Sequence, residues 1–272
     1  MHKLCRYVRF SINPFLPADE PGFNSFASKP AGEGLAVFFE LGVELAGTAD
    51  PATGLIVNVS DIDKTVRDCA VPVFAESIRA GYQAARHIGY YELAGLLKST
   101  WEKLADKFGS ARLSKLSLKL NPFRMLAVDE PNCAMVYFSE KFEFAASHKL
   151  WNERFSEQQN IDIFGKCANP AGHGHNYIVE VTVKWPAGQT LRSSDFERVV
   201  HQELIMAVDH KNLNEDVPEF RQTNPTVENI AIVAWNKLVG KFGPSTSLGT
   251  GKAALHCVTV WETDKTYSCY YG

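Results

Sequence analysis

The chain has 272 residues, 45% of them hydrophobic, and a formal net charge of −3 at pH 7. This length suits two domains of about 130 residues, each able to bury a core of its own. The weak negative charge gives no electrostatic basis for nucleic-acid binding, and the sequence has no run of about 18 apolar residues that would span a membrane.

The chain begins with MHKLCRYVRFSINPF, which we interpret as a strand because it lacks the apolar core and small-residue cleavage site of a secretory signal. The six cysteines are then expected to be reduced thiols, and we expect a cytoplasmic protein. Five of them lie in apolar or strand-like contexts. Cys167 differs because it lies in a polar, glycine-rich loop beside histidines, where a thiolate could have a chemical role.

A repeat links the first half of the chain to the second. PAGEGLAVFFELGVEL (30–45) matches PAGHGHNYIVEVTVKW (170–185), since both begin with Pro-Ala-Gly and continue as an alternating strand. Three further pairs follow in the same order: SDIDKTV (60–66) with SDFERVV (194–200), WEKLADKF (101–108) with WNKLVGKF (235–242), and LSKLSLKL (113–120) with LHCVTVWE (255–262). Four matched blocks in one order indicate a duplication.

Each half is therefore predicted to run strand, strand, helix, helix, strand, strand. Two helices on one face of a four-stranded antiparallel sheet give an α+β fold. The boundary is expected near residues 127–133, where VDEPN is polar and contains proline. We accordingly predict a first domain over 1–130 and a second over 131–272.

In the second half the sequence predicts strands over 141–148 and 176–185, with a turn at WPAGQ. Ser194 is expected to cap the next helix, with Glu197 completing a capping box. Apolar residues at helical spacing predict the buried stripe of that helix: Phe196, Val199, Val200, Leu204 and Val208. A second helix starts near Thr226, and its stripe is Val227, Ile230, Ala231, Ala234 and Leu238.

Two histidines, His173 and His175, are separated by one residue in GHGHNY. If they begin a strand, both side chains point to the same face and can share one metal ion. His148 ends the preceding strand, which a β-meander would bring alongside. Three histidine ligands leave one coordination position open, as in catalytic zinc sites. The alternative is that these are ordinary surface and turn histidines.

Two further features are ambiguous by themselves. Asp209 and His210 end a predicted helix, where a histidine is commonly only a cap that benefits from the helix dipole. Their functional interpretation is a carboxylate and an imidazole that tune a nearby acid or base such as Cys167. Glu262 lies in an otherwise apolar strand, where its carboxylate could accept two hydrogen bonds from a heterocycle or could simply be solvated.

Five motifs in the second half resemble the 6-pyruvoyl tetrahydropterin synthase family. They are FEFAASHKL, NIDIFGKCANPAGHGHNY, VDHKNLNEDVPEF, PTVENIA and VWETDK, in the order that the family has them. The resemblance covers about residues 136–272. It implies the tunnelling fold (T-fold), and the repeat extends this expectation to two tandem T-fold domains.

The resemblance also implies roles for the residues of this site. His148, His173 and His175 would bind Zn²⁺, and Cys167 would be the base that removes a proton from the side chain of 7,8-dihydroneopterin triphosphate. Asp209 and His210 would complete the proton-handling set, usually across a subunit interface. Glu262 would anchor the pterin ring, with Thr226 and Glu228 lining the pocket. From charge alone, Lys149, Lys166 and Lys211 are expected near the triphosphate.

The first half keeps the frame of the repeat and loses these residues. Pro14 falls near the place of His148, Glu33 at that of His173, and Leu35 at that of His175. Ala75 and Glu76 replace Asp209 and His210, and Leu120 replaces Glu262. We therefore predict that the first domain is a degenerate, non-catalytic T-fold domain.

The leading hypothesis is a zinc-dependent lyase that releases triphosphate from the pterin substrate. The alternatives are a 6-carboxytetrahydropterin synthase, a non-catalytic scaffold that binds zinc or pterin, and a protein comparable to urate oxidase, which joins two T-fold halves and needs no metal. Open sheet edges must be paired or covered. Because the family closes them by forming barrels, we expect a homo-oligomer, with active sites near domain or subunit interfaces.

Overall fold

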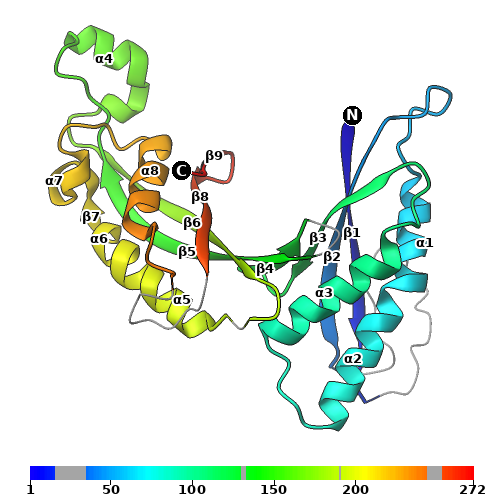
Figure 1. The fold of residues 1–272 in the computed structure, drawn as a ribbon. Coiled ribbons are helices and arrows are strands. Elements are labelled where there is room, and N and C mark those ends of the chain that lie inside the picture. The colour runs from blue at the N-terminus through cyan, green and yellow to red at the C-terminus, as the bar shows by residue number, and fades with distance from the viewer. Residues whose placement is uncertain (16–34, 130–132, 190, 244–252) are drawn as a thin grey trace. The chain divides into compact units, whose positions relative to one another are not determined.

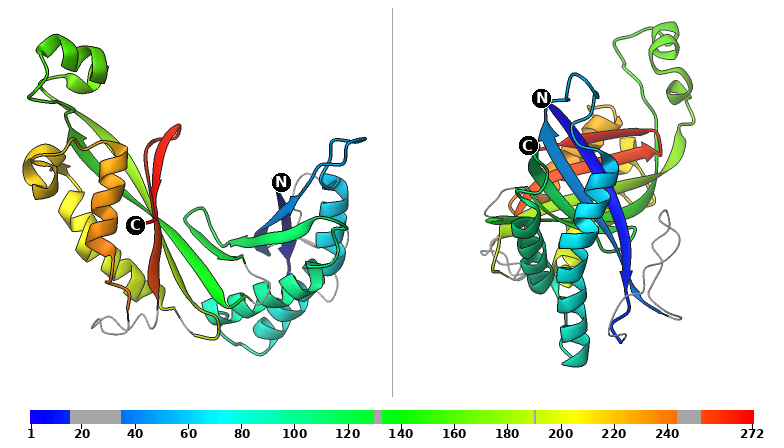
Figure 2. Two further views of the ribbon diagram at one scale, coloured as in Figure 1. Left: turned by 45° about the horizontal axis from the view of Figure 1, so that its top comes forward. Right: turned by 90° about the vertical axis from the view of Figure 1, so that its right-hand side faces the viewer.

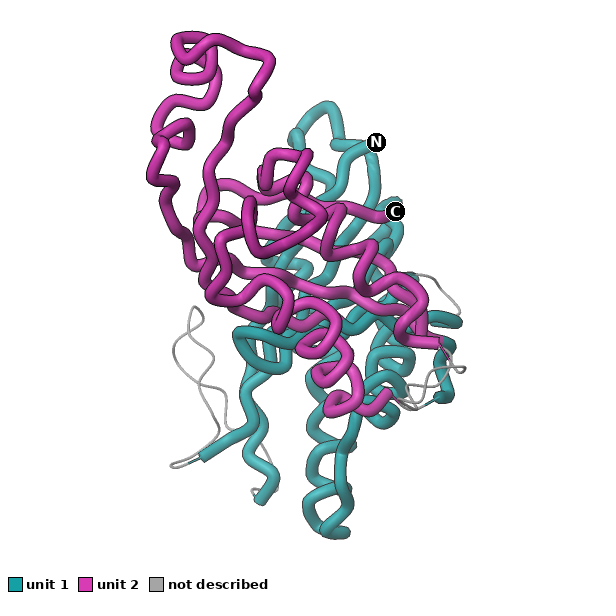
Figure 3. Tube along the Cα trace, turned by 90° about the vertical axis from the view of Figure 1, so that its left-hand side faces the viewer, with its two compact units in different colours: residues 1–138, 186–190 teal, residues 139–185, 191–272 magenta. Residues whose placement is uncertain are grey.

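The computed structural model describes residues 1–15, 35–129, 133–189, 191–243 and 253–272. These form two compact units, which Figure 3 shows in two colours. Unit 1 comprises residues 1–138 and 186–190, and unit 2 comprises residues 139–185 and 191–272. The placement of residues 130–132, at the predicted boundary, lies outside the described residues, as does that of Glu33.

Unit 1 contains an antiparallel run of strands covered by helices on one face (Figure 1). Its strands are β1 (His2–Ile12), β2 (Val37–Gly47), β3 (Arg112–Lys119) and β4 (Arg124–Val128). Their apolar residues alternate, so that one side of the sheet faces the helices. Phe74 of a covering helix packs edge-on against Phe10 and Phe39, with ring centroids 5.2 Å apart in both pairs.

Unit 1 has three long helices where the repeat predicted two. They are α1 (Val59–Cys69), α2 (Val71–Gln83) and α3 (Tyr90–Leu104). The first two follow one another with only Ala70 between them. Pro72 lies in the first turn of α2, where its missing N–H costs nothing, but it cannot continue α1 because its ring disrupts the preceding turn. This proline therefore divides what the pattern presented as one helix.

Unit 2 has strands β5 (Met135–His148), which begins in unit 1, β6 (His173–Pro186), β8 (Ala254–Thr263) and β9 (Thr266–Tyr270). The predicted strands over 141–148 and 176–185 are thus confirmed. The pairs β6–β8 and β8–β9 are antiparallel, while the short β7 (Lys211–Asn212) runs parallel to the end of β5. Phe144 of β5 stacks on Tyr177 of β6 with centroids 5.0 Å apart, which packs the two strands beneath the helices.

The helices of unit 2 lie on one face of these strands (Figure 2). The first runs through α5 (Ser193–Val200), a π-helical turn over His201–Ile205 and α6 (Met206–Val208). The second is α8 (Val227–Leu238), capped by Thr226 as predicted. Every residue of the two predicted apolar stripes is buried. The predicted cap at Ser194 is wrong: α5 begins one residue earlier, and Arg192 at the cap position forms no capping hydrogen bond through its side chain.

Three shorter helical segments, α4 (Glu157–Phe164), a 3₁₀ turn over Gly165–Ala168 and α7 (Leu213–Asp216), occupy the connections of unit 2. Another 3₁₀ turn covers Pro218–Phe220. Figure 1 shows α4 standing away from the strands, at the end of the unit where β5 stops. The connection between β5 and β6 therefore forms an excursion that leaves the sheet and returns to it.

The α+β class with an antiparallel sheet and helices is confirmed. By hydrogen bonding, the strands follow the order β1-β2-β3-β4-β5-β6-β8-β9, with β7 beside β5, and are assigned to one nine-stranded sheet. Two separate sheets of four strands are therefore not found. Among the described residues, none of the helices has the length and apolar character needed to cross a membrane.

Candidate functional site

Three histidines converge on the helix-facing side of β5 and β6. His148 is the last residue of β5, and His173 and His175 open β6. Because side chains alternate along a strand, His173, His175 and Tyr177 point to one face, as the HxH spacing predicted. His148 is only 1% exposed, so its imidazole lies in the interior of unit 2.

The hydrogen bonds of His148 fix its tautomer. Its Nδ1 lies 2.8 Å from the carbonyl oxygen of Pro225, which can only accept, so Nδ1 carries the proton. The lone pair is then on Nε2, which lies 3.1 Å from Nε2 of His173. A backbone carbonyl in this position is the partner that metal-binding histidines commonly have.

Two nitrogens in the cluster have no hydrogen-bond partner although they are buried, Nδ1 of His173 and Nε2 of His175. The ligand atoms of the three histidines all lie within 4.8 Å of one another. Bonds of about 2.0 Å to a tetrahedral zinc ion would separate two nitrogens by roughly 3.3 Å, close to the distance between His148 and His173. The cluster can therefore hold a metal ion, and its nitrogen donors suit zinc.

Glu262 of β8 lies beside the histidines. Its Oε1 is 3.6 Å from Nε2 of His148 and 3.5 Å from Nε2 of His175. Burial lowers the pKa of both histidines, and the charge of Glu262 opposes that shift. Burial outweighs the charge, so the neutral form of both imidazoles, which can bind a metal ion, is favoured. A ring held by this carboxylate would bring its substituents close to the cluster.

Cys167 is held near the same cluster by its backbone. Its carbonyl accepts a hydrogen bond of 2.8 Å from the amide of Leu150, two residues beyond His148. Burial raises the pKa of the Cys167 thiol, and the charge of Glu262 raises it further. A cation at the histidines would act in the opposite direction and favour the thiolate.

Asp209 and His210 follow α6, and Asp209 is tied to β5. Its Oδ1 accepts a 2.9 Å bond from the amide of Ala145, and its Oδ2 lies 3.0 Å from Nδ1 of His210. The hydrogen bond from the backbone amide of Ala145 holds the pKa of the Asp209 carboxyl below its usual value. His210 and His175 line one shallow cavity of about 470 Å³. In the described part of the protein, neither member of the pair forms a hydrogen bond or ion pair with Cys167.

Thr226 and Glu228 lie at the start of α8. The Thr226 hydroxyl accepts a bond of 3.3 Å from the amide of Asn229, so it serves as the helix cap. Glu228 is exposed in the first turn. The residue before Thr226 is Pro225, whose carbonyl accepts from His148, and this joins the start of α8 to the histidine cluster.

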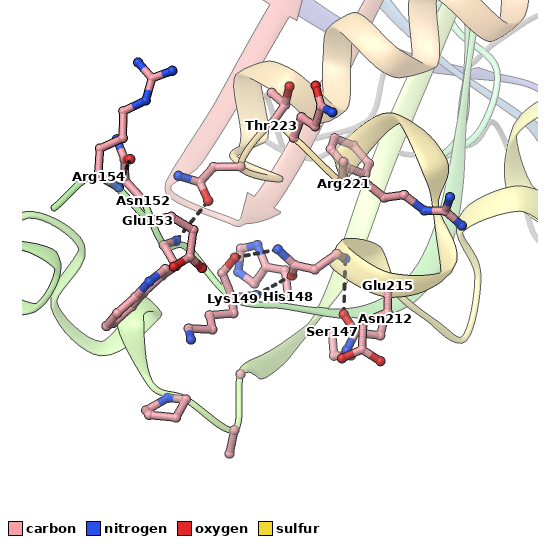
Figure 4. Close-up of a pocket in the computed structure, with 18 residues that line it drawn as sticks. Ser147, His148, Lys149, Asn152, Glu153, Arg154, Asn212, Glu215, Arg221 and Thr223 are labelled. Carbon is pink, nitrogen blue, oxygen red and sulfur yellow. Dashed lines mark hydrogen bonds between the residues drawn. The ribbon is translucent and has the colours of Figure 1, made fainter. Parts of the chain in front are cut away.

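The segment after His148 is held in a way that no pattern in the sequence indicates. Each amide from residue 149 to 152 has a partner outside the segment: Lys149 donates to Asn214, Leu150 to the Cys167 carbonyl, Trp151 to Asn224, and Asn152 to Asn160. Figure 4 marks hydrogen bonds among the residues drawn in this region as dashed lines. Three asparagines thus replace the strand partner that this segment lacks. In the sequence they are indistinguishable from turn residues.

Unit 1 offers no comparable cluster at the corresponding positions that the structure describes. Pro14 is buried, and Leu35 is 95% exposed. Ala75 is buried inside unit 1, whereas Glu76 is exposed. Within the described residues, the histidines of unit 2 form the one group of three or more potential metal ligands close enough to share an ion.

Comparison with known proteins places the second half of the chain in a family. Residues 137–272 match the model of the family described as 6-pyruvoyl tetrahydropterin synthase. The human 6-pyruvoyl tetrahydrobiopterin synthase is 38% identical over 138 residues, which cover 49% of this chain and 90% of the relative. The Dictyostelium discoideum protein of the same name is 32% identical over 141 residues, covering 50% and 96%.

Among solved structures, the 6-pyruvoyl tetrahydropterin synthase of Caenorhabditis elegans is similar at 33% identity, with a TM-score of 0.44, over 51% of this chain and 96% of the other. The family model spans half of the chain, and the human relative is covered almost completely. The motifs around Cys167, His173 and Glu262 all lie within the matched residues. The chain therefore belongs to the 6-pyruvoyl tetrahydropterin synthase family.

Proposed function

We propose that this protein is a zinc-dependent lyase that converts 7,8-dihydroneopterin triphosphate with loss of triphosphate, giving a 6-pyruvoyl pterin. The observation that carries the proposal is the convergence of three imidazoles on one point beside Glu262, with Oε1 of Glu262 within 3.6 Å of two of them. The relatives that cover this half are named for a pterin synthase. A carboxylate next to a metal cluster suits a substrate with a polar ring and hydroxyl groups on its substituent.

His148, His173 and His175 would hold the ion. Zinc held by them would supply a Lewis acid that acidifies the C–H and O–H groups of the substrate's hydroxylated substituent and orients it. The bond from His148 Nδ1 to the Pro225 carbonyl keeps Nε2 free to ligate. The lowered pKa values of His148 and His175 keep both rings unprotonated at neutral pH.

Glu262 would accept two N–H groups of the pterin ring and hold it with its substituent over the histidines. Cys167, as thiolate, would take a proton from the hydroxyl-bearing carbon next to the ring, and the ring C=N bond would accept the electron pair and a proton while that hydroxyl becomes a ketone. Loss of a second proton, from the neighbouring carbon, would expel triphosphate by breaking its carbon–oxygen bond and leave an enol that becomes the second carbonyl. Asp209 and His210 would return protons to the product. Thr226 and Glu228 would line the ring pocket from the start of α8.

The test is to incubate the protein with 7,8-dihydroneopterin triphosphate, with and without a chelator, and to identify products by mass spectrometry. Triphosphate release and a 6-pyruvoyl pterin are expected, and the chelator should abolish both. Zinc added back should restore them. Formation of the 6-carboxy pterin alone would contradict the pyruvoyl assignment, whereas zinc and pterin binding without turnover would identify a scaffold.

Unit 1 enters this proposal as a degenerate T-fold domain that supports assembly, with 1–130 and 131–272 as the two domains. Its strands β1 to β4 follow one another as β5, β6, β8 and β9 do in the second half, although it has three long helices. The protein would form a homo-oligomer that pairs its open strand edges. Analytical ultracentrifugation tests this, because a monomer at micromolar concentration would contradict it.

A further inference from the structure

A large cavity adjoins the histidine cluster. Its volume is about 720 Å³, within the range of small-molecule pockets, and His148 forms part of its wall. The rest of the wall comes from the segment after β5 and from the loops around α7 and before α8 (Figure 4). Among the charged and amide residues that line it are Lys149, Asn152, Arg154, Asn212, Arg221 and Asn224.

Three of these asparagines present hydrogen-bond donors, because their oxygens are already engaged. The oxygen of Asn152 accepts from the amide of Arg154 (2.9 Å), that of Asn212 from Asn214 (3.1 Å), and that of Asn224 from Trp151 (2.9 Å). Because a backbone N–H can only donate, these bonds fix which end of each amide is oxygen. The NH₂ groups of all three are left without a partner among the described residues.

The cations that line the cavity have no carboxylate partner in the described part of the chain. Among the residues that the structure describes, Lys149, Arg154 and Arg221 form no ion pair, whereas Lys237 and Lys241 of the same unit pair with Glu219 and Glu203. Lys149 rests on the Trp151 ring, with its ammonium 4.1 Å from the centroid, so it is held at the wall.

Figure 4 shows Arg154 and Arg221 on different sides of the cavity, with both side chains extending outward. Both residues are exposed, so their guanidinium groups are free to turn toward an anion in the cavity. The three cations outnumber the two carboxylates of the wall, Glu153 and Glu215. The cavity is therefore positively charged as well as rich in donors.

We propose that this cavity is a polyanion site that holds the triphosphate group of the substrate, through the amide groups of Asn152, Asn212 and Asn224 and the charges of Lys149, Arg154 and Arg221. Linked phosphates offer many acceptor oxygens and several negative charges, which matches dispersed donors better than a single carboxylate would. That the ligand is triphosphate rests on the proposed function, whereas its negative charge is inferred from the residues that line the cavity. Of the lysines expected near the triphosphate, Lys149 lines this cavity; Lys166 and Lys211 do not.

The direct test is to measure by calorimetry the binding of inorganic triphosphate to the whole 272-residue chain. Metal content is measured before and after, because triphosphate chelates divalent ions. Asn152→Asp keeps the oxygen that accepts from Arg154 and replaces the NH₂ donor by a second oxygen with negative charge. It should weaken binding roughly tenfold or more. Arg154→Ala and Arg221→Ala should each weaken it about fivefold, and added salt should reduce these differences.

Two matched controls separate this effect from net charge alone. Asn58→Asp makes the same exchange at the cap of α1 in unit 1, where the Asn58 oxygen accepts from Ser60 and an aspartate caps equally well. Arg86→Ala removes an exposed arginine from a cavity of unit 1. Both should bind triphosphate like the unaltered protein, and thermal unfolding without ligand should show that Asn152→Asp is folded.

The outcomes distinguish this proposal from the proposed function. If the pterin substrate is not converted but triphosphate binds and Asn152→Asp abolishes its binding, the anion site stands and the lyase assignment falls. If the substrate is converted with an unchanged KM in all three cavity variants, the anion site is wrong and the lyase stands. Equal triphosphate binding by Asn152→Asp and Asn58→Asp would also overturn the site.

Discussion

The strands of the two units follow one another in the same way, but the units carry different residues at corresponding positions. In unit 2 the end of β5 and the start of β6 carry three histidines, whereas the corresponding positions of unit 1 include Pro14 and an exposed Leu35. Both units bury apolar helix faces, and both have a β-bulge in a central strand pair, between Glu44 and Leu45 and between Thr182 and Val183. The packing of each unit depends on the alternation of apolar and polar residues along its strands. The site depends on a few polar residues, so these can be lost without loss of the packing.

The largest expected difference between the units is in metal binding. The unaltered protein should hold one zinc ion, His175→Ala should hold none, and the loss should reduce turnover by more than about 100-fold. His87→Ala, a matched change at an exposed histidine of unit 1, should keep one ion and full activity. Metal content by mass spectrometry checks this. Two ions per chain would show that the histidine cluster is not the sole metal site.

The next difference concerns the thiols. Cys167→Ser should slow turnover about 1000-fold, because the serine hydroxyl is a far weaker acid and cannot supply the base. The metal should remain, since none of its ligands has changed. Cys69→Ser in unit 1 is the control and should leave both properties unchanged. Equal rates for Cys167→Ser and the unaltered protein would leave the site without its proposed base.

A core substitution tests whether the units are stable independently. Phe74 is fully buried and packs on Phe10 and Phe39, so Phe74→Ala should lower the stability of unit 1 by about 3 kcal/mol. If the units unfold separately, calorimetry should show one transition shifted while zinc stays bound at the temperature between the two. The exposed Phe123 gives the control, Phe123→Ala. Simultaneous loss of zinc and of unit 1 would show that the units unfold together.

The smallest effect expected is electrostatic and confined to unit 1. Burial alone would raise the pKa of Glu40, but its bond to Arg9 and the charge of Lys119 outweigh burial and lower it. A carboxylate whose pKa is lower in the folded than in the unfolded state stabilises the fold above the ordinary pKa. That contribution is lost as the pH falls through the folded-state value.

The stability of unit 1 should therefore decline in acid from about pH 4.5 downward, in excess of the decline in the Glu40→Gln variant. The two proteins are compared by denaturant unfolding at a series of pH values. Parallel curves for both would show that Glu40 makes no such contribution.

The sequence was sufficient wherever the structure follows from local alternation. The buried stripes of α5–α6 and α8 and the shared face of His173 and His175 are of this kind. The sequence was insufficient where a single residue decides at which position a helix begins or ends. Pro72 divided a predicted helix, and α5 started at Ser193 without using the Ser194 cap.

Long-range contacts were beyond the sequence for a different reason. Only the family resemblance placed Glu262 with the histidines, because its position against His148 and His175 depends on the β6–β8 register, which includes a bulge. The roles of Asn214, Asn224 and Asn160 depend on which amides the fold brings to them. Nothing in their spacing indicates those partners, so such residues emerge only from the folded protein.

The bond from Leu150 to Cys167 has a consequence for how this protein can change. It closes the neck of the excursion that carries α4, and Asn160 ties the excursion internally to Asn152. Beyond this neck, Ile161 and Ile163 are 46% and 59% exposed. Exposed residues of α4 such as these two can be exchanged or labelled without moving the thiol, because its position is set at the neck. Asn152 and Arg154, in the same excursion, line the cavity and are not exchangeable in this way. The exposed side of α4 is thus the place where a probe can be attached close to the site without disturbing it.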